Sequence, residues 1–311
     1  MSENDLPAVG IPRAMLYYRY GPLWEHFFLT LGVSTVLSFP GSRGILETGT
    51  TRAPDESCLS LKMFMGHVES LIGRCGQIFI PRYSNYGPTE LFCTRYESLY
   101  DQARNIFRSS GQRFITCNID VQGGSPEPEA FEALGVELGF SAKESRRAWR
   151  EASRALEQQQ KTRERAQREL AEKPGLKVLI AGHSYILSDP YLGKPILDDL
   201  EAADVISLRT DALDPDTARK ASIRFTPTCR WIVSEEIVGG VVLWKEKVDG
   251  IILVSAFPCG PDSMTNEMLI RRIKGIPILT LVLDTQSGMA GIETRIESFL
   301  DIIRFQKGEM V

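Results

Sequence analysis

The sequence predicts an α/β protein in which two domains, each with a mostly parallel sheet, are joined by a long helix. Its 311 residues are about twice the length of a typical domain. In both halves, short apolar runs rich in β-branched residues alternate with amphipathic stretches, and this alternation is typical of parallel sheets covered by helices. A stretch without glycine or proline, residues 141–173, separates the halves.

The N-terminal domain is expected to span residues 1–140. Its predicted strands are residues 9–11, 34–39, 77–80 and 113–119, and its predicted helices are residues 22–31, 59–72 and 96–107. Strands and helices of these lengths favour a mostly parallel sheet with helices on both faces.

Residues 141–174 are predicted to form the connecting helix. Ser141 and Glu144 have the spacing of a capping box, and Pro174 and Gly175 end the helical pattern. At 1.5 Å per residue, the helix would be on the order of 50 Å long. Its second half, residues 158–168, is almost entirely polar, which favours a solvated connection over the alternative, a surface that binds a partner.

The C-terminal domain is expected to span residues 175–311. Its predicted strands are residues 177–181, 205–208, 250–257 and 278–283, and its predicted helices are residues 191–202, 232–245, 262–274 and 291–305. The apolar runs at 251–254 and 276–283 lack two-residue alternation, which predicts central strands buried on both faces.

Composition excludes several classes of function. Thirty-six basic against 40 acidic residues give a net charge of −4, so no overall positive field attracts nucleic acid or an anionic membrane. The longest apolar runs are far shorter than the roughly 20 residues of a membrane-spanning helix. The acidic N-terminus does not resemble a signal peptide, so we expect a cytoplasmic protein whose six cysteines are reduced.

Polar residues follow several predicted strands, where parallel sheets place their ligands. Arg13 and Arg82 follow strands of the first domain, and His183, Tyr185 and Cys259 follow strands of the second. The arginines are expected either to bind an anionic ligand or to pair with carboxylates such as that of Glu56. His183 and Tyr185 are expected either to donate hydrogen bonds at a site or to form a structural turn.

Three of the six cysteines stand where a predicted helix begins. Cys259 and Cys58 come directly before predicted helices, and Cys93 lies in a loop just before one. The positive end of a helix favours a thiolate. Cys75 and Cys117 are expected to be buried hydrophobic residues at a helix end and within a strand, and Cys229 is expected to be structural.

The wide spacing of Cys58, Cys93 and Cys259 excludes a local motif such as C-x-x-C. A shared site would have to be assembled by the tertiary structure, in a cleft between the domains. Three kinds of arrangement remain open at this point. Zinc would need a fourth ligand such as His67 or His183, an iron–sulfur cluster would leave one iron open, and the thiols could also be buried without any metal.

Six groups of residues resemble, in the same order, subunits of the 2-hydroxyacyl-CoA dehydratase and benzoyl-CoA reductase superfamily, and more closely its activase-associated, double-cubane-like iron–sulfur branch. They are 10–14 (Gly-Ile-Pro-Arg-Ala) with 22–24 and 27–28, 56–58 (Glu-Ser-Cys) with Lys62 and 66–67, 79–82 (Phe-Ile-Pro-Arg), 182–185 (Gly-His-Ser-Tyr), 189–191 (Asp-Pro-Tyr) and 259–263 (Cys-Gly-Pro-Asp-Ser).

The resemblance implies two Rossmann-like domains with an iron–sulfur cluster between them, ligated by Cys58, Cys93 and Cys259. The cluster in this superfamily is a [4Fe-4S] with an open iron or part of a double-cubane [8Fe-9S] unit, and its electrons come from an ATP-hydrolysing activase with its own cluster. The present sequence has no Walker-type phosphate loop, so ATP hydrolysis is expected on that partner. Relatives also imply a homodimer or a pair with a paralogous subunit.

The resemblance leaves two functions open. A reductase or dehydratase-type enzyme would pass the electron to a substrate at the open iron. However, residues 284–291 (Asp-Thr-Gln-Ser-Gly-Met-Ala-Gly) lack the two glutamates and the histidine that the family has there. This loss of proton-transfer groups favours the alternative, a non-catalytic electron relay or cluster carrier. A ligand-binding protein without a cluster is the third alternative.

Overall fold

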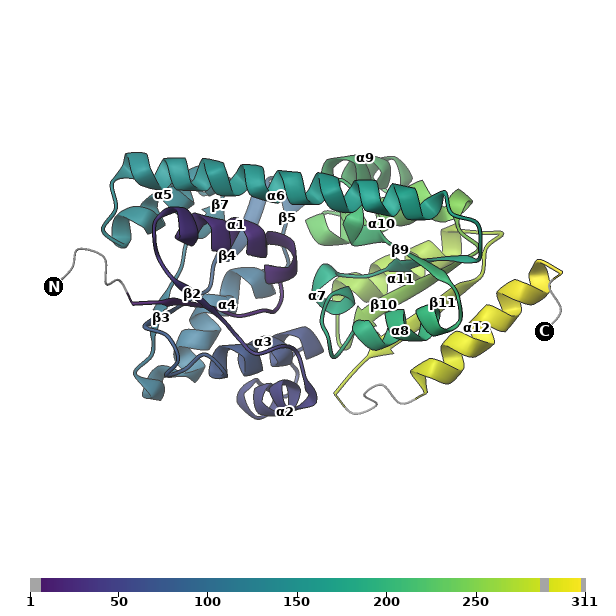
Figure 1. Ribbon diagram of the computed structural model, residues 1–311, viewed down its shortest axis with the longest axis horizontal. Coiled ribbons are helices and arrows are strands. Elements are labelled where there is room, and N and C mark those ends of the chain that lie inside the picture. Colours follow the sequence, from purple (N-terminus) through teal and green to yellow (C-terminus); the bar gives the residue numbers. More distant parts are fainter. Residues whose placement is uncertain (1–6, 286–290, 309–311) are drawn as a thin grey trace. The chain divides into compact units, whose positions relative to one another are not determined.

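A computed structural model describes residues 7–285 and 291–308. The chain divides into two compact units, residues 1–159 and 160–311, which are described separately below. Both units have parallel sheets covered by helices, so the predicted α/β class is confirmed. The long helix is confirmed as well, since α6 (Ala142–Ala171) runs without interruption through the point of division (Figure 1).

Unit 1 is built on a four-stranded parallel sheet with the order β2-β1-β3-β6. The strands are β1 (Val9–Ile11), β2 (Thr35–Leu37), β3 (Gln77–Phe79) and β6 (Arg113–Ile115). A smaller sheet contains β5 (Glu90–Leu91), β4 (Arg82–Gly87) and β7 (Asn118–Asp120). The predicted single strand at 113–119 is therefore wrong, because the chain leaves the first sheet after Ile115 and pairs with β4 from Asn118.

The helices of unit 1 bury an aromatic core against the sheet. They are α1 (Tyr17–Thr30), α2 (Arg43–Arg52), α3 (Leu59–Glu69), α4 (Thr94–Ile106) and α5 (Glu127–Glu137). Phe27 and Phe28 of α1 meet Phe131 of α5 and Phe79 of β3 edge to face, at centroid distances of 5.0 and 5.2 Å. These rings are fully buried and fix α1 and α5 on one side of β3.

Two glycines let α2 and α3 cross closely. A β-carbon at Gly49 would lie 1.7 Å from the carbonyl oxygen of Lys62, and one at Gly66 would lie 2.0 Å from that of Ile45. Only glycine permits this approach of two backbones. The contact sets the position of α3, whose N-terminal residue follows Cys58.

Unit 2 is built on a four-stranded parallel sheet with the order β11-β10-β8-β9. Its strands are β8 (Lys177–Ala181), β9 (Ile206–Arg209), β10 (Gly250–Ala256) and β11 (Ile278–Leu283). β10 is buried along its whole length, as predicted. The prediction of a second central strand is wrong for β11, which lies at the edge of the sheet and leaves Val282 46% exposed.

Helices cover both faces of this sheet. They are α7 (Ser184–Leu187), α8 (Lys194–Ala202), α9 (Pro215–Phe225), α10 (Ile232–Trp244), α11 (Gly260–Arg272) and α12 (Ile292–Gln306). Leu179, Leu253 and Val238 belong to one core with residues of α11, which places α10 and α11 on one face. On the other face, α12 packs beside Gly250 and contacts α8 (Figure 1).

Several predicted helix limits are wrong. α1 begins five residues before Pro22, which lies inside the helix. The predicted helix 191–202 begins only at Lys194, because residues 190–193 form a turn. Four helices were not predicted: α2, α5, α7 and α9.

The two sheets share one topology. If the strands of each sheet are numbered along the chain, both sheets read two-one-three-four. In this arrangement the chain reverses its direction of winding between the first and third strands, and a crevice opens beyond their carboxyl ends. The crevices are therefore expected at the ends of β1 and β3 in unit 1, and of β8 and β10 in unit 2.

Candidate functional site

The ends of β8 and β10, where a crevice is expected in unit 2, carry two residues that the sequence predicted to be functional. β8 and β10 pair in parallel up to Ala181 and Leu253. His183 comes two residues after β8 and caps the N-terminus of α7, and Cys259 comes three residues after β10 and caps the N-terminus of α11. The sheet topology thus brings these two side chains to one place from positions 76 residues apart in the sequence.

Asp262 completes this group. It lies in the first turn of α11, and a carboxylate oxygen lies 2.7 Å from Nε2 of His183. His183 is 5% exposed and Asp262 is 3% exposed. One donor atom from each of Cys259, His183 and Asp262 can be chosen so that all three lie within 4.8 Å of one another. The group therefore offers a sulfur, a nitrogen and an oxygen to the same small volume.

Tyr185 holds the imidazole from one side. Its ring is stacked on that of His183 with the centroids 4.7 Å apart and the planes 9° from parallel. The sequence predicted that His183, Tyr185 and Cys259 follow strands of the second domain, at the end of the sheet where ligands bind. The structure brings them together within unit 2. The sequence did not identify Asp262 as a partner of His183, although the position of Asp262 in the first turn after Cys259 was a usable signal.

Two polar atoms of the group have no hydrogen-bond partner within the described part of the chain. They are Nδ1 of His183 and the second carboxylate oxygen of Asp262, and both are buried. Buried polar atoms are satisfied in the great majority of cases, so these two atoms are available to a water molecule, an ion or another ligand.

Two of the three predicted cluster ligands, Cys58 and Cys93, lie in unit 1. Cys58 caps the N-terminus of α3 and Cys93 caps that of α4, and neither side chain makes a capping hydrogen bond. The charge of Cys93 contributes to raising the pKa of Cys58, and the charge of Arg95 contributes to lowering it. The two thiols therefore share one environment at the start of two helices, together with an arginine that the sequence analysis did not single out.

The prediction of a thiolate at Cys58 is wrong for the protein with no metal or cluster bound. Burial raises the pKa of the Cys58 thiol, and this effect exceeds the opposing effect of the backbone N–H groups of Leu61 and Ser60. A helix N-terminus lowers the pKa of a thiol and apolar burial raises it, and at Cys58 burial has the larger effect. A coordinated metal would remove the proton, because ligation by sulfur requires the thiolate.

The ends of β1 and β3, where a crevice is expected in unit 1, carry arginines. Arg13 comes two residues after β1, and its backbone N–H donates to Oγ of Ser38 at 2.8 Å. Arg82 comes three residues after β3, and its guanidinium donates to Asp101 at 2.6 Å. Arg82 also lies 4.9 Å from the ring centroid of Tyr100. Among the described residues, Nε of each arginine is buried without a partner, so each retains a donor.

His67, Cys117 and Cys229 are buried, whereas the prediction of burial is wrong for Cys75, which is partly exposed. His67 is fully buried in α3 with Nδ1 2.8 Å from Oγ of Ser38, and burial lowers its pKa to about 3. Cys117 is buried between β6 and β7 rather than within a strand, and burial raises its pKa. Burial also raises the pKa of Cys229 to about 11. Cys75 lies six residues beyond α3 instead of ending it, with its sulfur 3.5 Å from the Leu71 carbonyl oxygen.

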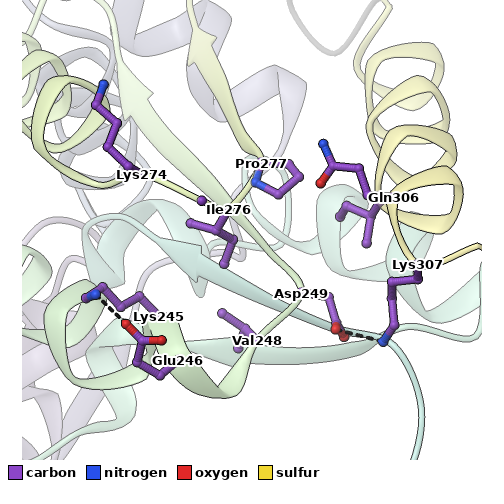
Figure 2. A pocket seen from close by; sticks show the side chains of 11 residues that line it. Lys245, Glu246, Val248, Asp249, Lys274, Ile276, Pro277, Gln306 and Lys307 are labelled. Carbon is purple, nitrogen blue, oxygen red and sulfur yellow. Dashed lines mark hydrogen bonds and ion pairs between the residues drawn. The ribbon is translucent and has the colours of Figure 1, made fainter.

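A cavity of about 340 Å³ lies at the opposite end of the strands of the second sheet, where β10 and β11 begin. Figure 2 shows Lys245 paired with Glu246 and Lys307 paired with Asp249, the latter at 2.8 Å. Lys274 approaches the carbonyl oxygen of Ile270 at 3.5 Å. Because parallel sheets bind ligands at the carboxyl ends of their strands, this cavity is a weaker candidate than the group around Cys259.

The donor chemistry of the three predicted ligands fits an iron–sulfur cluster. Cys58, Cys93 and Cys259 are not in disulfides, and each is the N-cap of a helix. Clusters of this kind are held by thiolates and carry negative charge, which free backbone N–H groups at helix N-termini favour. The segment 284–291, which separates the two functional alternatives, has residues 286–290 outside the described residues.

Comparisons with known proteins give one family. Residues 8–213, about two thirds of the chain, match the family described as the CoA enzyme activase uncharacterised domain (DUF2229). No curated protein matches the chain. Within residues 7–285 and 291–308, none of the helices has the length and apolar character needed to cross a bilayer.

Proposed function

The chain belongs to the family of the CoA enzyme activase uncharacterised domain, and from this premise we propose that it is an iron–sulfur protein that takes electrons from an ATP-hydrolysing activase. The description of the family supports a role linked to activase-type CoA enzymes. The observation that carries the proposal is the position of Cys58, Cys93 and Cys259, three thiols that each stand at the first turn of a helix.

The proposed role of each residue follows from its chemistry. Cys58, Cys93 and Cys259 would ligate the cluster, which supplies one-electron chemistry at low potential. Arg13, with its unpartnered Nε among the described residues, would offset negative charge, and Arg82 would do the same from its pair with Asp101. Arg95 would favour the thiolate of Cys58, because its charge opposes the rise in pKa that burial causes.

His183 and Tyr185 would tune the cluster from outside its ligand shell. A hydrogen bond to a cluster sulfur raises the reduction potential, because it stabilises the added negative charge. The stacked ring of Tyr185 and the carboxylate of Asp262 hold the imidazole of His183 in one orientation. The cluster would be either a [4Fe-4S] or a double-cubane [8Fe-9S] unit.

Two uses of the electron are compatible with this site. The first is reductive chemistry on a substrate of the acyl-CoA class at an open iron, as in dehydratase-type enzymes. The second is an electron relay or cluster carrier for another subunit. The sequence of residues 284–291, which has an aspartate but no glutamate or histidine, favours the relay.

Anaerobic purification followed by iron and sulfide analysis tests the ligand assignment. We expect the variants Cys58→Ser, Cys93→Ser and Cys259→Ser each to lose most of the iron. Cys75→Ser is the matched control, because Cys75 is also partly exposed and lies in unit 1 but caps no helix. Full iron in all three variants, or equal loss in the control, would show that the assignment is wrong.

A second experiment separates the enzyme from the relay. The protein is reduced with activase and ATP, and acyl-CoA esters are added while the electron paramagnetic resonance spectrum is recorded. A changed spectrum with an ester supports substrate binding at the cluster. An unchanged spectrum with every ester supports the relay.

A further inference from the structure

We propose that Cys259, His183 and Asp262 form, within unit 2 alone, a binding site for a thiophilic divalent cation such as Zn²⁺. The proposal goes beyond the cluster and does not depend on it, because it needs no residue of unit 1. Cys259 would serve either occupant, so the cation and the cluster would exclude one another. The site is the one that unit 2 offers when the cluster is absent.

The place of the group in the fold is the first argument. His183 and Cys259 follow β8 and β10, the two strands between which the direction of winding reverses. Loops at these strand ends can carry ligand-binding residues, because the strands and helices of the sheet provide the stable scaffold. β8 and β10 are almost completely buried, so they form a rigid base for the site.

The donor set is the second argument. Thiolate, imidazole and carboxylate are the ligand types of protein-bound Zn²⁺, and three protein ligands with one open position are typical of catalytic zinc sites. Bonds of about 2.0–2.3 Å place the donors of a tetrahedral site roughly 3.5 Å apart. The donors of this group lie within 4.8 Å of one another, and the nearest atoms of His183 and Asp262 are 2.7 Å apart, so side-chain rotations that move them by about 1 Å would bring them to these separations around a cation.

The unpartnered atoms are the third argument, and they are independent of the spacing. Nδ1 of His183 and one carboxylate oxygen of Asp262 are buried with no hydrogen bond within the described part of the chain. The side chains of the two residues are only 6% and 4% exposed. A cation would accept a lone pair from each residue and add positive charge beside the buried carboxylate, only one of whose oxygens is paired with His183.

The chemistry of binding follows from these donors. The Cys259 thiol gives up its proton to solvent as the metal–sulfur bond forms, and His183 binds through a neutral ring nitrogen. Three protein donors leave a fourth position for water or a small anion. The soft sulfur donor selects Zn²⁺ or Co²⁺ over Mg²⁺ and Ca²⁺, which prefer oxygen ligands.

Cobalt titration of the full-length protein, purified free of iron and kept reduced, tests the proposal. Co²⁺ bound by a thiolate gives a charge-transfer absorption in the near ultraviolet, and competition with Zn²⁺ then reports the affinity for zinc. We expect saturation at one metal per chain. The variant Cys259→Ser should lose the charge-transfer band, and His183→Gln and Asp262→Asn should weaken the affinity by at least about 10-fold.

Cys58→Ser and Cys93→Ser are the controls that separate this proposal from the cluster. Both should lose the cluster in the anaerobic experiment and should bind Co²⁺ like the wild type. Equal loss of Co²⁺ in these variants, or binding that survives Cys259→Ser, would overturn the proposal. Thermal unfolding without metal checks the fold of each variant, and Zn²⁺ should raise the unfolding temperature of the wild type but not of Cys259→Ser.

Discussion

The two units share a strand order but carry different types of side chain at the ends of the equivalent strands. Arg13 and His183 each stand two residues after the first strand of their sheet, and Arg82 and Cys259 each stand three residues after the third. Unit 1 thus presents two guanidinium groups where unit 2 presents an imidazole and a thiol. The fold fixes where a ligand would bind, and the residues on the strand exits decide which ligand it is.

The cysteines differ in the same way. Cys58 and Cys93 stand at helix N-termini, and the charge of Arg95 opposes the rise in the pKa of Cys58 that burial causes. Cys259 stands at a helix N-terminus with His183 and Asp262 close by. Unit 1 therefore offers thiols to a cluster, whereas unit 2 can also offer nitrogen and oxygen. The following predictions test what supports each arrangement.

The largest expected effect concerns the strand that leads to Cys259. Ile252 is fully buried in the centre of β10, so Ile252→Ala should lower the free energy of unfolding by about 2–5 kcal/mol through the cavity it leaves. Val282, on the edge strand β11, is the matched control, and Val282→Ala should cost far less. Similar urea midpoints for the two variants would contradict the central position of β10.

The next effect concerns His67 in unit 1 and depends on pH. Burial lowers the pKa of His67 from 6.5 to about 3, with a smaller effect of Arg13, so the unfolded chain binds more protons between these values. Stability is therefore lost as the pH falls below 6.5, by about 2 kcal/mol at pH 5 for this group.

The variant His67→Gln should reduce this loss between pH 7 and pH 5, as measured by urea unfolding at both values. His26→Gln, at an exposed position of α1, is the control for removing an imidazole. An unchanged pH dependence in His67→Gln would show that another group causes the loss.

A smaller effect concerns the crossing of α2 and α3, which positions Cys58. The new β-carbon in Gly66→Ala would meet the carbonyl oxygen of Ile45 at 2.0 Å, and we expect a cost of about 1–3 kcal/mol. Gly44→Ala is the control, since its β-carbon would meet only Oγ of Ser42 at 3.9 Å. If thermal unfolding shows the same midpoint for both variants, the close crossing does not hold α3 in place.

The smallest effects concern the two ends of α6. Ser141 and Glu144 form the predicted capping box, with the Glu144 N–H donating to Oγ of Ser141 at 3.2 Å and the Ser141 N–H donating to the Glu144 carboxylate at 3.0 Å. Ser141→Ala should cost about 1 kcal/mol. Arg168→Ala, which breaks an exposed pair with Glu164, should cost about 0.5 kcal/mol or less. A reversed order in denaturant unfolding would contradict the role of the cap.

Local patterns predicted much of the fold. The buried run of β10 and the capping box of α6 were both recognisable, because each depends on residues close in sequence. β11 was misjudged because an edge strand can carry the same β-branched run as a central one, and only its neighbours in the sheet distinguish them. α2 was missed because its two glycines and three threonines are poor helix formers, and its close packing on α3 outweighs this preference. α9 did have a readable signal, since Asp214 caps it just before Pro215.

The candidate site was predictable only where it depends on position along the chain. The placement of Cys58, Cys93 and Cys259 before helices followed from the sequence, and the structure makes all three N-caps. The pairing of His183 with Asp262, 79 residues away, requires the tertiary structure. So does the burial that raises the pKa of Cys58, since the burial comes from packing around α3 and not from its own residues.

The most direct test of the proposed function is electron paramagnetic resonance of the anaerobically purified protein before and after addition of activase and ATP. The account predicts an iron–sulfur signal that develops only with activase and ATP together and is lost in Cys58→Ser, Cys93→Ser and Cys259→Ser. A protein that carries no iron, or a cluster that activase and ATP do not reduce, would contradict it.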